Sequence, residues 1–340
     1  MILFALVFLV SALLTAGVRH YLLRRGIMDR PNARSSHATP VPRGGGIGIV
    51  LAFLCAVVWL VHEQAVPAGL ASALVGGGIA IGLVGFLDDR FRMAAWPRLI
   101  VHLLAAAWAV RCFTAMSPGV FTGGPRGWFS GGVALLGLVW LTNLFNFMDG
   151  IDGLAGMEAA TVSGLAALLL SRGGMPGDTR VCWMLAAASL GFLVWNWPPA
   201  KVFLGDVGSG FLGFSLGVPA LFSSRGGGAR LWTWLILLGA FLVDSTVTLL
   251  RRMLARERWY EAHRSHAYQH AARALGSHVK VTLAFAAINA GYLFPLAWCA
   301  ERYPAFAPAC AAAAAVPLLV LALRFHAGRK ERSTENAAQD

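Results

Sequence analysis

Charged residues are scarce in this chain. Only 13% of the 340 residues are charged, whereas 57% are hydrophobic. An ordinary soluble domain carries about 25% charged residues, so the composition excludes that class. Apolar runs of about 20 residues recur along the whole chain instead, which is typical of a polytopic membrane protein.

Other features that the sequence lacks narrow the possible classes of membrane protein. No basic residue precedes the first apolar run, and Arg24 and Arg25 follow it, so we predict an uncleaved anchor that starts outside. With no soluble domain, nucleic acid binding is not expected. The cysteines lack metal-ligand spacing and are predicted to be small core residues. They are Cys55, Cys112, Cys182, Cys299 and Cys310.

The predicted fold class is all-α, a polytopic membrane bundle of about eleven helices in one transmembrane domain over residues 1–325. Residues 326–340 are polar, without an apolar period, and are predicted to be a disordered cytoplasmic tail. The spans are expected at roughly 2–22, 46–62, 68–87, 97–115, 131–147, 154–171, 181–197, 208–222, 231–250, 279–299 and 304–325.

Positive charge predicts the orientation. The loops after spans 1, 3, 5, 7 and 9, with the C-terminal tail, hold 20 Lys and Arg residues, against seven in the opposite loops. Positive residues accumulate on the cytoplasmic side, so the N-terminus is expected outside and the C-terminus inside. The net charge of +12 is then mainly a topology signal. The cytoplasmic loops are expected at 23–45, 88–96, 148–153, 198–207 and 251–278.

Six of the nine aspartates fall in four short motifs at the cytoplasmic ends of spans. Carboxylates are costly near hydrocarbon, so their collection at one surface indicates chemistry. Their natural guest is a hard divalent cation, Mg²⁺ with Mn²⁺ as the alternative, that carries a phosphorylated substrate. The six are Asp29, Asp88, Asp89, Asp149, Asp152 and Asp206.

The motif FLDDR contains Asp88 and Asp89 as neighbours. Adjacent helical residues diverge by about 100°, so the two carboxylates cannot both face one ion squarely. One is expected to touch a metal or phosphate while the other positions a partner. A membrane-exit cap with Arg90 and Arg92 as counterions is the structural alternative.

The motif NLFNFMDGIDGLAG, residues 143–156, spaces polar residues at intervals of three. Such steps drift by about 60° each on a helix, and Gly150 and Gly153 are expected to break the helix there. The resulting turn would gather oxygens that suit Mg²⁺ and sugar hydroxyls; a plain Asp-Gly turn is the alternative. The polar residues are Asn143, Asn146, Asp149 and Asp152.

The motif WNWPPAKVFLGDVGSGFLG, residues 195–213, combines a pair of prolines, Lys201 and a glycine-rich loop that opens the next span. Gly205 and Gly208 would let backbone N–H groups approach an anion, and the helix N-terminus adds a positive dipole. Asp206 would hold the cation. The motif resembles a phosphate cradle. It is not a Walker loop, because the sequence GK[ST] is absent from it.

The motif EAHRSHAYQH, residues 261–270, would place His263, His266 and His270 on one helical face. Together with Arg264, that face is expected to meet phosphate oxygens. A Zn²⁺ site and an ordinary interfacial helix are the alternatives.

Two further features are less specific. Asp244 precedes Arg251 by seven residues, which places it on the same helical face about 10 Å away. A structural role and a substrate role are both open for it. Residues 28–46 form a loop rich in proline and glycine, and its basic residues include Arg34, His37 and Arg43.

Taken in order, these motifs resemble the polyprenyl-phosphate N-acetylhexosamine-1-phosphate transferases, the MraY/WecA-like superfamily. The resemblance runs from residue 28 to about 275 and rests chiefly on DxPxxRxxHxxPxPRGGG, NxxNxxDGIDGLA and NxPPAKxFxGDxGSxxLG. The last loop reads HRSHAYQH, without the adjacent histidines of the peptidoglycan enzymes. The chain is therefore more similar to the branch that starts O-antigen and related glycans.

The resemblance implies a reaction at the cytoplasmic face of the bacterial inner membrane. Undecaprenyl phosphate would attack the β-phosphorus of a UDP-N-acetyl-sugar, giving undecaprenyl-diphospho-sugar and UMP. Asp206 and Asn146 would hold Mg²⁺, and Asp88 would orient or deprotonate the lipid phosphate with Asp89 beside it. Asp149 and Asp152 would complete the catalytic set. Substrate contacts would come from Arg34, His37, Arg43, Asn143, Asn196, Lys201, Gly205, Gly208, Ser209, Asp244, His263, Arg264, His266 and His270.

Three alternatives remain beside this interpretation. A phospho-N-acetylmuramoyl-pentapeptide transferase would share the chemistry. An intramembrane prenyltransferase also uses two aspartate-rich motifs and Mg²⁺, but it would release diphosphate rather than UMP. A transporter for an anionic solute predicts internal repeats and mid-membrane charges, and no repeat is apparent. The expected partners are both substrates and membrane lipid, with a homodimer as an open alternative.

Overall fold

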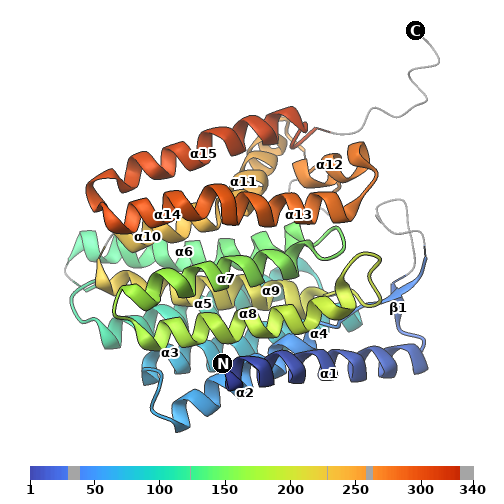
Figure 1. The fold of residues 1–340 in the computed structure, drawn as a ribbon, viewed down its shortest axis with the longest axis horizontal. Coiled ribbons are helices and arrows are strands. Elements are labelled where there is room, and N and C mark those ends of the chain that lie inside the picture. Colours follow the sequence, from blue (N-terminus) through green and yellow to red (C-terminus); the bar gives the residue numbers. More distant parts are fainter. Residues whose placement is uncertain (30–38, 123, 228, 258–262, 330–340) are drawn as a thin grey trace.

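Long helices that run side by side dominate the structure (Figure 1). In the described part of the chain, the strands are β1 (Met28–Asp29) and β2 (Val41–Pro42), which pair antiparallel. The predicted all-α class is therefore confirmed. The computed structural model describes residues 1–29, 39–122, 124–227, 229–257 and 263–329.

The helices follow the apolar runs of the sequence, and short π and 3₁₀ turns extend some of them. The α-helices are α1 (Ile2–Arg24), α2 (Ile47–His62), α3 (Ala68–Ser72), α4 (Gly78–Phe91), α5 (Ala95–Met116), α6 (Pro125–Met148), α7 (Leu154–Arg172), α8 (Pro176–Asn196), α9 (Asp206–Ser223), α10 (Ala229–Leu237), α11 (Gly239–Leu254), α12 (Ala267–Leu275), α13 (His278–Ile288), α14 (Phe294–Arg302) and α15 (Ala307–Arg324). The short turns are η1 (Ala73–Gly77), η2 (Ser224–Gly226), η3 (Asn289–Leu293) and η4 (Pro304–Phe306).

Within the described residues, eight helical segments are long and apolar enough to cross a membrane. The pair α10 and α11 makes a ninth if it counts as one span, although it bends by 71°. The expected number of eleven is thus not confirmed. Two expected spans, 46–62 and 181–197, do coincide with α2 and α8. However, α2 has only 16 residues, and α8 carries the charged residues Asp178 and Arg180 within its first five positions.

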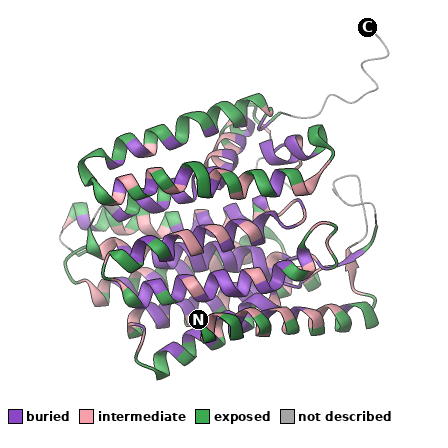
Figure 2. Cartoon of the chain, in the orientation of Figure 1, coloured by how far each residue is buried: buried purple, intermediate pink, exposed green. Residues whose placement is uncertain are grey.

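The core of this multi-pass membrane protein lies around α9. Of the apolar window of α9, 89% is buried inside the protein, against 17% for α1 at the periphery (Figure 2). Small residues allow this close packing, as is usual between membrane helices. At Gly213, for example, a Cβ atom would collide with the backbone of Leu141 on α6.

One end of the bundle collects the polar motifs. The end of α4, the start of α5, the end of α6 and the start of α9 meet there. The loop after β2 joins them, because Phe203 donates its N–H to Pro42 (2.8 Å) and accepts a hydrogen bond from the backbone N of Gly45 (2.8 Å). Both β1 and α12 lie at this same end in Figure 1.

The predicted tail begins at 326, but residues 326–329 belong to the folded part. Ala327 is fully buried, and the backbone N of Gly328 donates to Ser265 O at 2.6 Å. Residues 330–340 lie outside the described residues.

Candidate active site

Three carboxylates and two guanidinium groups form one connected ion network at the end of the bundle. Asp88 and Asp89 lie near the C-terminus of α4, Arg98 lies in the first turn of α5, and Asp206 opens α9. Arg43 follows β2 and completes the network. Two of the four acidic motifs thus meet at one place, and the charges come from four separate segments.

Arg43 bridges two of the carboxylates. Its Nε lies 2.8 Å from Asp89 Oδ1 and its Nη2 lies 2.5 Å from Asp206 Oδ1. Desolvation opposes the charged guanidinium, but the nearby charges of Asp206 and Asp89 outweigh it and raise the pKa of Arg43 above its usual value. Arg43 therefore stays cationic, and its planar fork fixes the spacing of the two carboxylates.

Arg98 makes the second bridge. Its Nη1 donates to Asp88 Oδ2 and lies 3.0 Å from Asp206 Oδ2. Asp88 also accepts a hydrogen bond of 2.6 Å from the backbone N of Met93, which follows α4. Both oxygens of Asp206 are therefore paired with a guanidinium group, and the Asp88 carboxylate is aimed at Arg98.

Asp89 has a different task from its neighbour. Its two oxygens accept the backbone N–H groups of Asp206 (2.9 Å) and Val207 (3.1 Å) at the start of α9. A carboxylate is favoured there, because the first N–H groups of a helix lack partners and carry its positive dipole. Gly205 has φ +76°, and a Cβ on it would lie 2.5 Å from Asp89 Oδ2. Glycine is thus required at 205 for this cap.

Asn146 connects the end of α6 to the network. Its Nδ2 donates to Asp206 Oδ1 (2.9 Å) and to Ser209 Oγ (3.1 Å). Asn143, one turn earlier, is engaged elsewhere: its Nδ2 donates to Val139 O at 2.7 Å and lies 3.2 Å from His102 Nδ1. Of the two asparagines, only Asn146 directly bonds the network.

The chain turns back after α6, as the two glycines of the motif predicted. Gly153 has φ +78°, and its N–H donates to Asn196 Oδ1 at 3.0 Å. Asp149 follows α6 directly. Burial raises the pKa of Asp149 to about 7, since the charge of Arg43 only partly offsets the desolvation of the carboxyl group.

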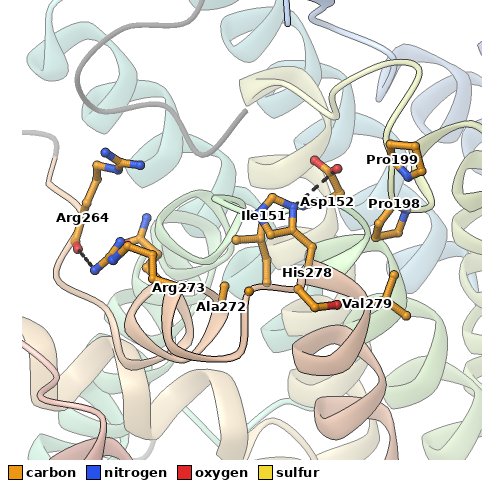
Figure 3. A pocket seen from close by; sticks show the side chains of 12 residues that line it. Ile151, Asp152, Pro198, Pro199, Arg264, Ala272, Arg273, His278 and Val279 are labelled. Atoms are coloured by element: carbon orange, nitrogen blue, oxygen red, sulfur yellow. Dashed lines mark hydrogen bonds and ion pairs between the residues drawn. The ribbon is translucent and has the colours of Figure 1, made fainter. Parts of the chain in front are cut away.

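Asp152 lies at a cavity of about 510 Å³ beside this turn (Figure 3). Its Oδ2 accepts a hydrogen bond of 3.1 Å from the backbone N of Ala200. Arg264 and Arg273 lie across the cavity from Pro198 and Pro199 (Figure 3). The wall thus offers carboxylate, guanidinium and apolar groups to one ligand. The lining residues are Ile151, Asp152, Pro198, Pro199, Arg264, Gln269, Ala272, Arg273, Gly276, Ser277, His278 and Val279.

The histidine segment differs from its prediction. Helix α12 begins at Ala267, so His263 and His266 precede the helix and only His270 lies in it. The three do not form one helical face. His263 and His266 stack with ring centroids 4.9 Å apart, and burial together with the neighbouring His266 and Arg252 lowers the pKa of His263 to about 3.

Asp244 holds this segment in place. Its carboxylate accepts the backbone N–H groups of Ala267 and Tyr268, each at 2.9 Å, and lies 3.2 Å from His266 Nδ1. It is thus the N-terminal cap of α12. Of the two roles open for Asp244, the structure favours the structural one. Arg251, its expected partner, instead donates to Ala327 O at 2.8 Å.

Four predicted residues are not placed in the network: two lie outside the described residues and two lie elsewhere. Arg34 and His37 lie outside the described residues. Lys201 is exposed, with its Nζ 5.7 Å from the ring centroid of Trp195. Asp29 belongs to β1, where it pairs in register with Val41.

Arg98 was not among the predicted site residues. It stands in AAWPRLI, a few residues beyond the DD pair, where a basic residue at a membrane boundary is ordinary. The available signal was its position in the first turn of the span that follows two aspartates. A helical turn back after 91 would have brought it beside them.

The donor chemistry of the network fits a hard cation. Within the described residues, no three His, Cys, Asp or Glu side chains are placed to hold a metal ion. Even so, Asp206 and Asn146 offer carboxylate and amide oxygens, the ligands that Mg²⁺ prefers. The guanidinium groups of Arg43 and Arg98 stand in as cations against both Asp206 oxygens. The Asp206 carboxylate thus attracts positive charge, and an incoming metal ion would have to displace one of the two guanidinium groups from it.

The fold and the site define a class: a multi-pass helical membrane protein with a charged site at one end of the bundle. The sequence model of the family described as "Glycosyl transferase family 4" matches residues 71–224. A Bacillus subtilis protein, named "Probable undecaprenyl-phosphate N-acetylglucosaminyl 1-phosphate transferase", is 30% identical over 76% of this chain and 74% of its own length. This chain therefore belongs to glycosyl transferase family 4.

The relatives that are similar to this chain carry the names of two different transferases. An "Undecaprenyl-phosphate alpha-N-acetylglucosaminyl 1-phosphate transferase" of Thermotoga maritima is 30% identical over 79% of this chain and 80% of its own length. A "Phospho-N-acetylmuramoyl-pentapeptide-transferase" of Geobacillus kaustophilus is 31% identical over 67% of this chain and 74% of its own length. The chain is thus similar to both kinds of transferase.

Proposed function

We propose that this protein transfers an N-acetylhexosamine-1-phosphate, or a 6-deoxy analogue, from a UDP-sugar to undecaprenyl phosphate. The products are undecaprenyl-diphospho-sugar and UMP, in the first membrane step of O-antigen or a related cell-envelope polysaccharide. The protein would act in the bacterial inner membrane, with the site at the cytoplasmic face. The observation that carries the proposal is the ion network beside a cavity lined by Asp152, Arg264 and Arg273, in a family of transferases.

The charges of the network suit the meeting of two phosphorylated substrates. Two unit charges about 4 Å apart repel by roughly 4 kcal/mol at an effective dielectric near 20. Arg43 and Arg98 lie in the network, and Arg264 and Arg273 lie at the cavity. These guanidinium groups offset the repulsion and stabilise the charge that develops on the transferred phosphoryl group.

Asp88 is better suited to orient a group than to remove a proton. A phosphoester has its second pKa near ~6, so the lipid phosphate is largely ionised before it attacks. The Asp88 carboxylate is also engaged, by Arg98 and by the backbone of Met93. We infer that Asp88 holds Arg98 against the lipid phosphate, and that Asp89 holds the start of α9 so that Asp206 points into the site.

Asp206 and Asn146 are the residues that would hold Mg²⁺. When bound, the ion would neutralise phosphate charge and act as a Lewis acid on the phosphoryl oxygens. Asp152 lines the cavity, and Asp149 precedes it by three residues in the same turn. Both are expected to contact the diphosphate, sugar or nucleotide. The named relatives of both kinds have nearly the same percentage identity to this chain, so the choice of the O-antigen branch depends on the loop HRSHAYQH.

The test is conversion by the purified protein in detergent. Undecaprenyl phosphate and Mg²⁺ would be supplied with a panel of UDP-N-acetyl-sugars and, separately, with UDP-N-acetylmuramoyl-pentapeptide. We expect UMP and a lipid-linked sugar from at least one UDP-N-acetylhexosamine and none from the pentapeptide substrate. Release of diphosphate would indicate a prenyltransferase, and turnover only with the pentapeptide would assign the peptidoglycan branch. Either result contradicts the proposal.

A matched pair of variants tests the site itself. Asp206→Asn should lower turnover about a hundredfold or more, because it removes a charged ligand from the centre of the network. Asp178→Asn is the control: this buried aspartate pairs with Arg225 at 2.6 Å. Asp178 lies 18 residues before Asn196 on α8, and therefore about 27 Å from the site end of that helix. Full turnover by Asp206→Asn would remove Asp206 from the proposed metal site.

A further inference from the structure

His278 is the first residue of α13 and lines the cavity beside Asp152 (Figure 3). Its Nδ1 atom lies 3.3 Å from the backbone N of Asp152 and 3.4 Å from Asp152 Oδ2. One ring nitrogen therefore faces both the backbone and the carboxylate of the same residue. His278 lies beyond the predicted histidine motif, so nothing in the motif analysis assigned it a role.

A second residue of α13 grips the same point. Thr282, one turn further along, donates its Oγ1 proton to Asp152 O at 3.1 Å and is fully buried. Residues four apart share a helical face, so the first turn of α13 contacts both the N–H and the C=O group of Asp152. From the other side, the backbone N of Ala200 donates to Asp152 Oδ2 at 3.1 Å. Asp152 is thus held through its backbone by α13 and through its carboxylate by the loop after α8.

We propose that His278 is a positioning residue, which fixes the backbone of Asp152 and thereby aims its carboxylate into the cavity, where the carboxylate recognises the nucleotide part of the substrate. The inference rests on the proposed function of this site. Asp152 stands between Ile151 and Gly153 in a turn, outside any helix, so its direction depends on such contacts. A polar group displaced by about 1 Å loses much of its effect on binding and rate.

The competing role is a direct contact between His278 and the ligand. With Nδ1 occupied by the Asp152 N–H, the other ring nitrogen, Nε2, carries the proton and is a donor. The two roles require different substitutes, since an Asn side chain places its amide near the position of Nδ1, whereas Gln reaches the position of Nε2. Asn should therefore preserve a positioning contact, and Gln should preserve a ligand contact.

The experiment compares His278→Ala, His278→Asn and His278→Gln in detergent-solubilised protein. UMP is the probe for binding by calorimetry, and UMP release gives kcat and KM. His62→Ala, an exposed histidine at the end of α2, is the matched control. We expect Ala and Gln to weaken UMP binding and raise the KM for the UDP-sugar about tenfold, with a smaller change in kcat. Asn should restore both values to near wild type.

A double variant shows whether His278 acts through Asp152. In an Asp152→Asn background, His278→Ala should add little to the loss, because residues that act as one unit are not additive. Additive losses, rescue by Gln but not Asn, or full activity of Ala would each overturn the proposal. If wild type binds UMP but converts no UDP-sugar, the proposed function fails, while the binding series still tests His278.

Discussion

Arg98 Nη1 lies 3.0 Å from Asp206 Oδ2, although 108 positions separate the two residues. The same nitrogen donates to Asp88. Arg98 therefore joins the end of α4 to the start of α9 from a third helix, α5. The arrangement uses a planar, permanently charged group, which a lysine ammonium does not reproduce in shape.

The first prediction concerns this bridge. Arg98→Lys should keep the charge but lose the double contact, so kcat should fall roughly ten- to hundredfold, and Arg98→Ala should fall further. The exposed neighbour Arg90 is the control, since Arg90→Ala removes a cation without touching the network. UMP release per folded protein is the measurement. Wild-type kcat in Arg98→Ala would contradict an active-site role for this arginine.

The second prediction follows from Asp149. Its pKa is raised to about 7 in the folded protein, against about 3.9 in an unfolded chain. Between these values the folded state binds the extra proton, so stability should fall as pH rises through the window and level off above about 7. In chelator, the unfolding temperature of wild type should therefore drop from about pH 5 to about pH 7 more than that of Asp149→Asn. Parallel curves would contradict the shift.

The sequence predicted the convergence of acidic motifs because each lies at the end of an apolar run. Charge bias then assigned those ends to one side, and the structure brings Asp88, Asp89 and Asp206 into one network. Helical class and the turn at Gly153 followed from composition and glycine placement in the same way. These features depend on local pattern, which a single sequence contains.

Contacts between distant segments could not be predicted in this way. Asp89 caps α9 through space, and no local pattern distinguishes it from Asp88. The start of α12 at Ala267 depends on Asp244, 23 positions earlier, so the histidine spacing wrongly suggested a continuous helical face. Arg98 and His278 carry no motif of their own and become visible only once the helices are packed.

The third prediction concerns the C-terminal hook, residues 325–329, which follows α15. Gly328 donates its backbone N–H to Ser265 O at 2.6 Å, and Ala327 O accepts from Arg251 at 2.8 Å. Ser265 Oγ in turn lies 2.9 Å from His263 Nδ1. The hook thus supports the segment that leads into α12 and the arginine side of the cavity.

Removing the hook should therefore loosen the site without removing any group that touches substrate. Truncation after Arg324 should raise the KM for the UDP-sugar about tenfold, the size expected from the loss of one or two hydrogen bonds, and should increase proteolysis near Ser265. Truncation after Arg329 removes only residues 330–340 and is the matched control, with wild-type kinetics expected.

Gly328→Val tests the contact in the full-length chain. The φ angle of Gly328 is +75°, and a Cβ atom on it would lie 2.8 Å from the Cβ of Arg251. This variant should raise KM and proteolysis as truncation after Arg324 does. If truncation after Arg324 and Gly328→Val both match wild type in KM and protease resistance, the hook does not support the site.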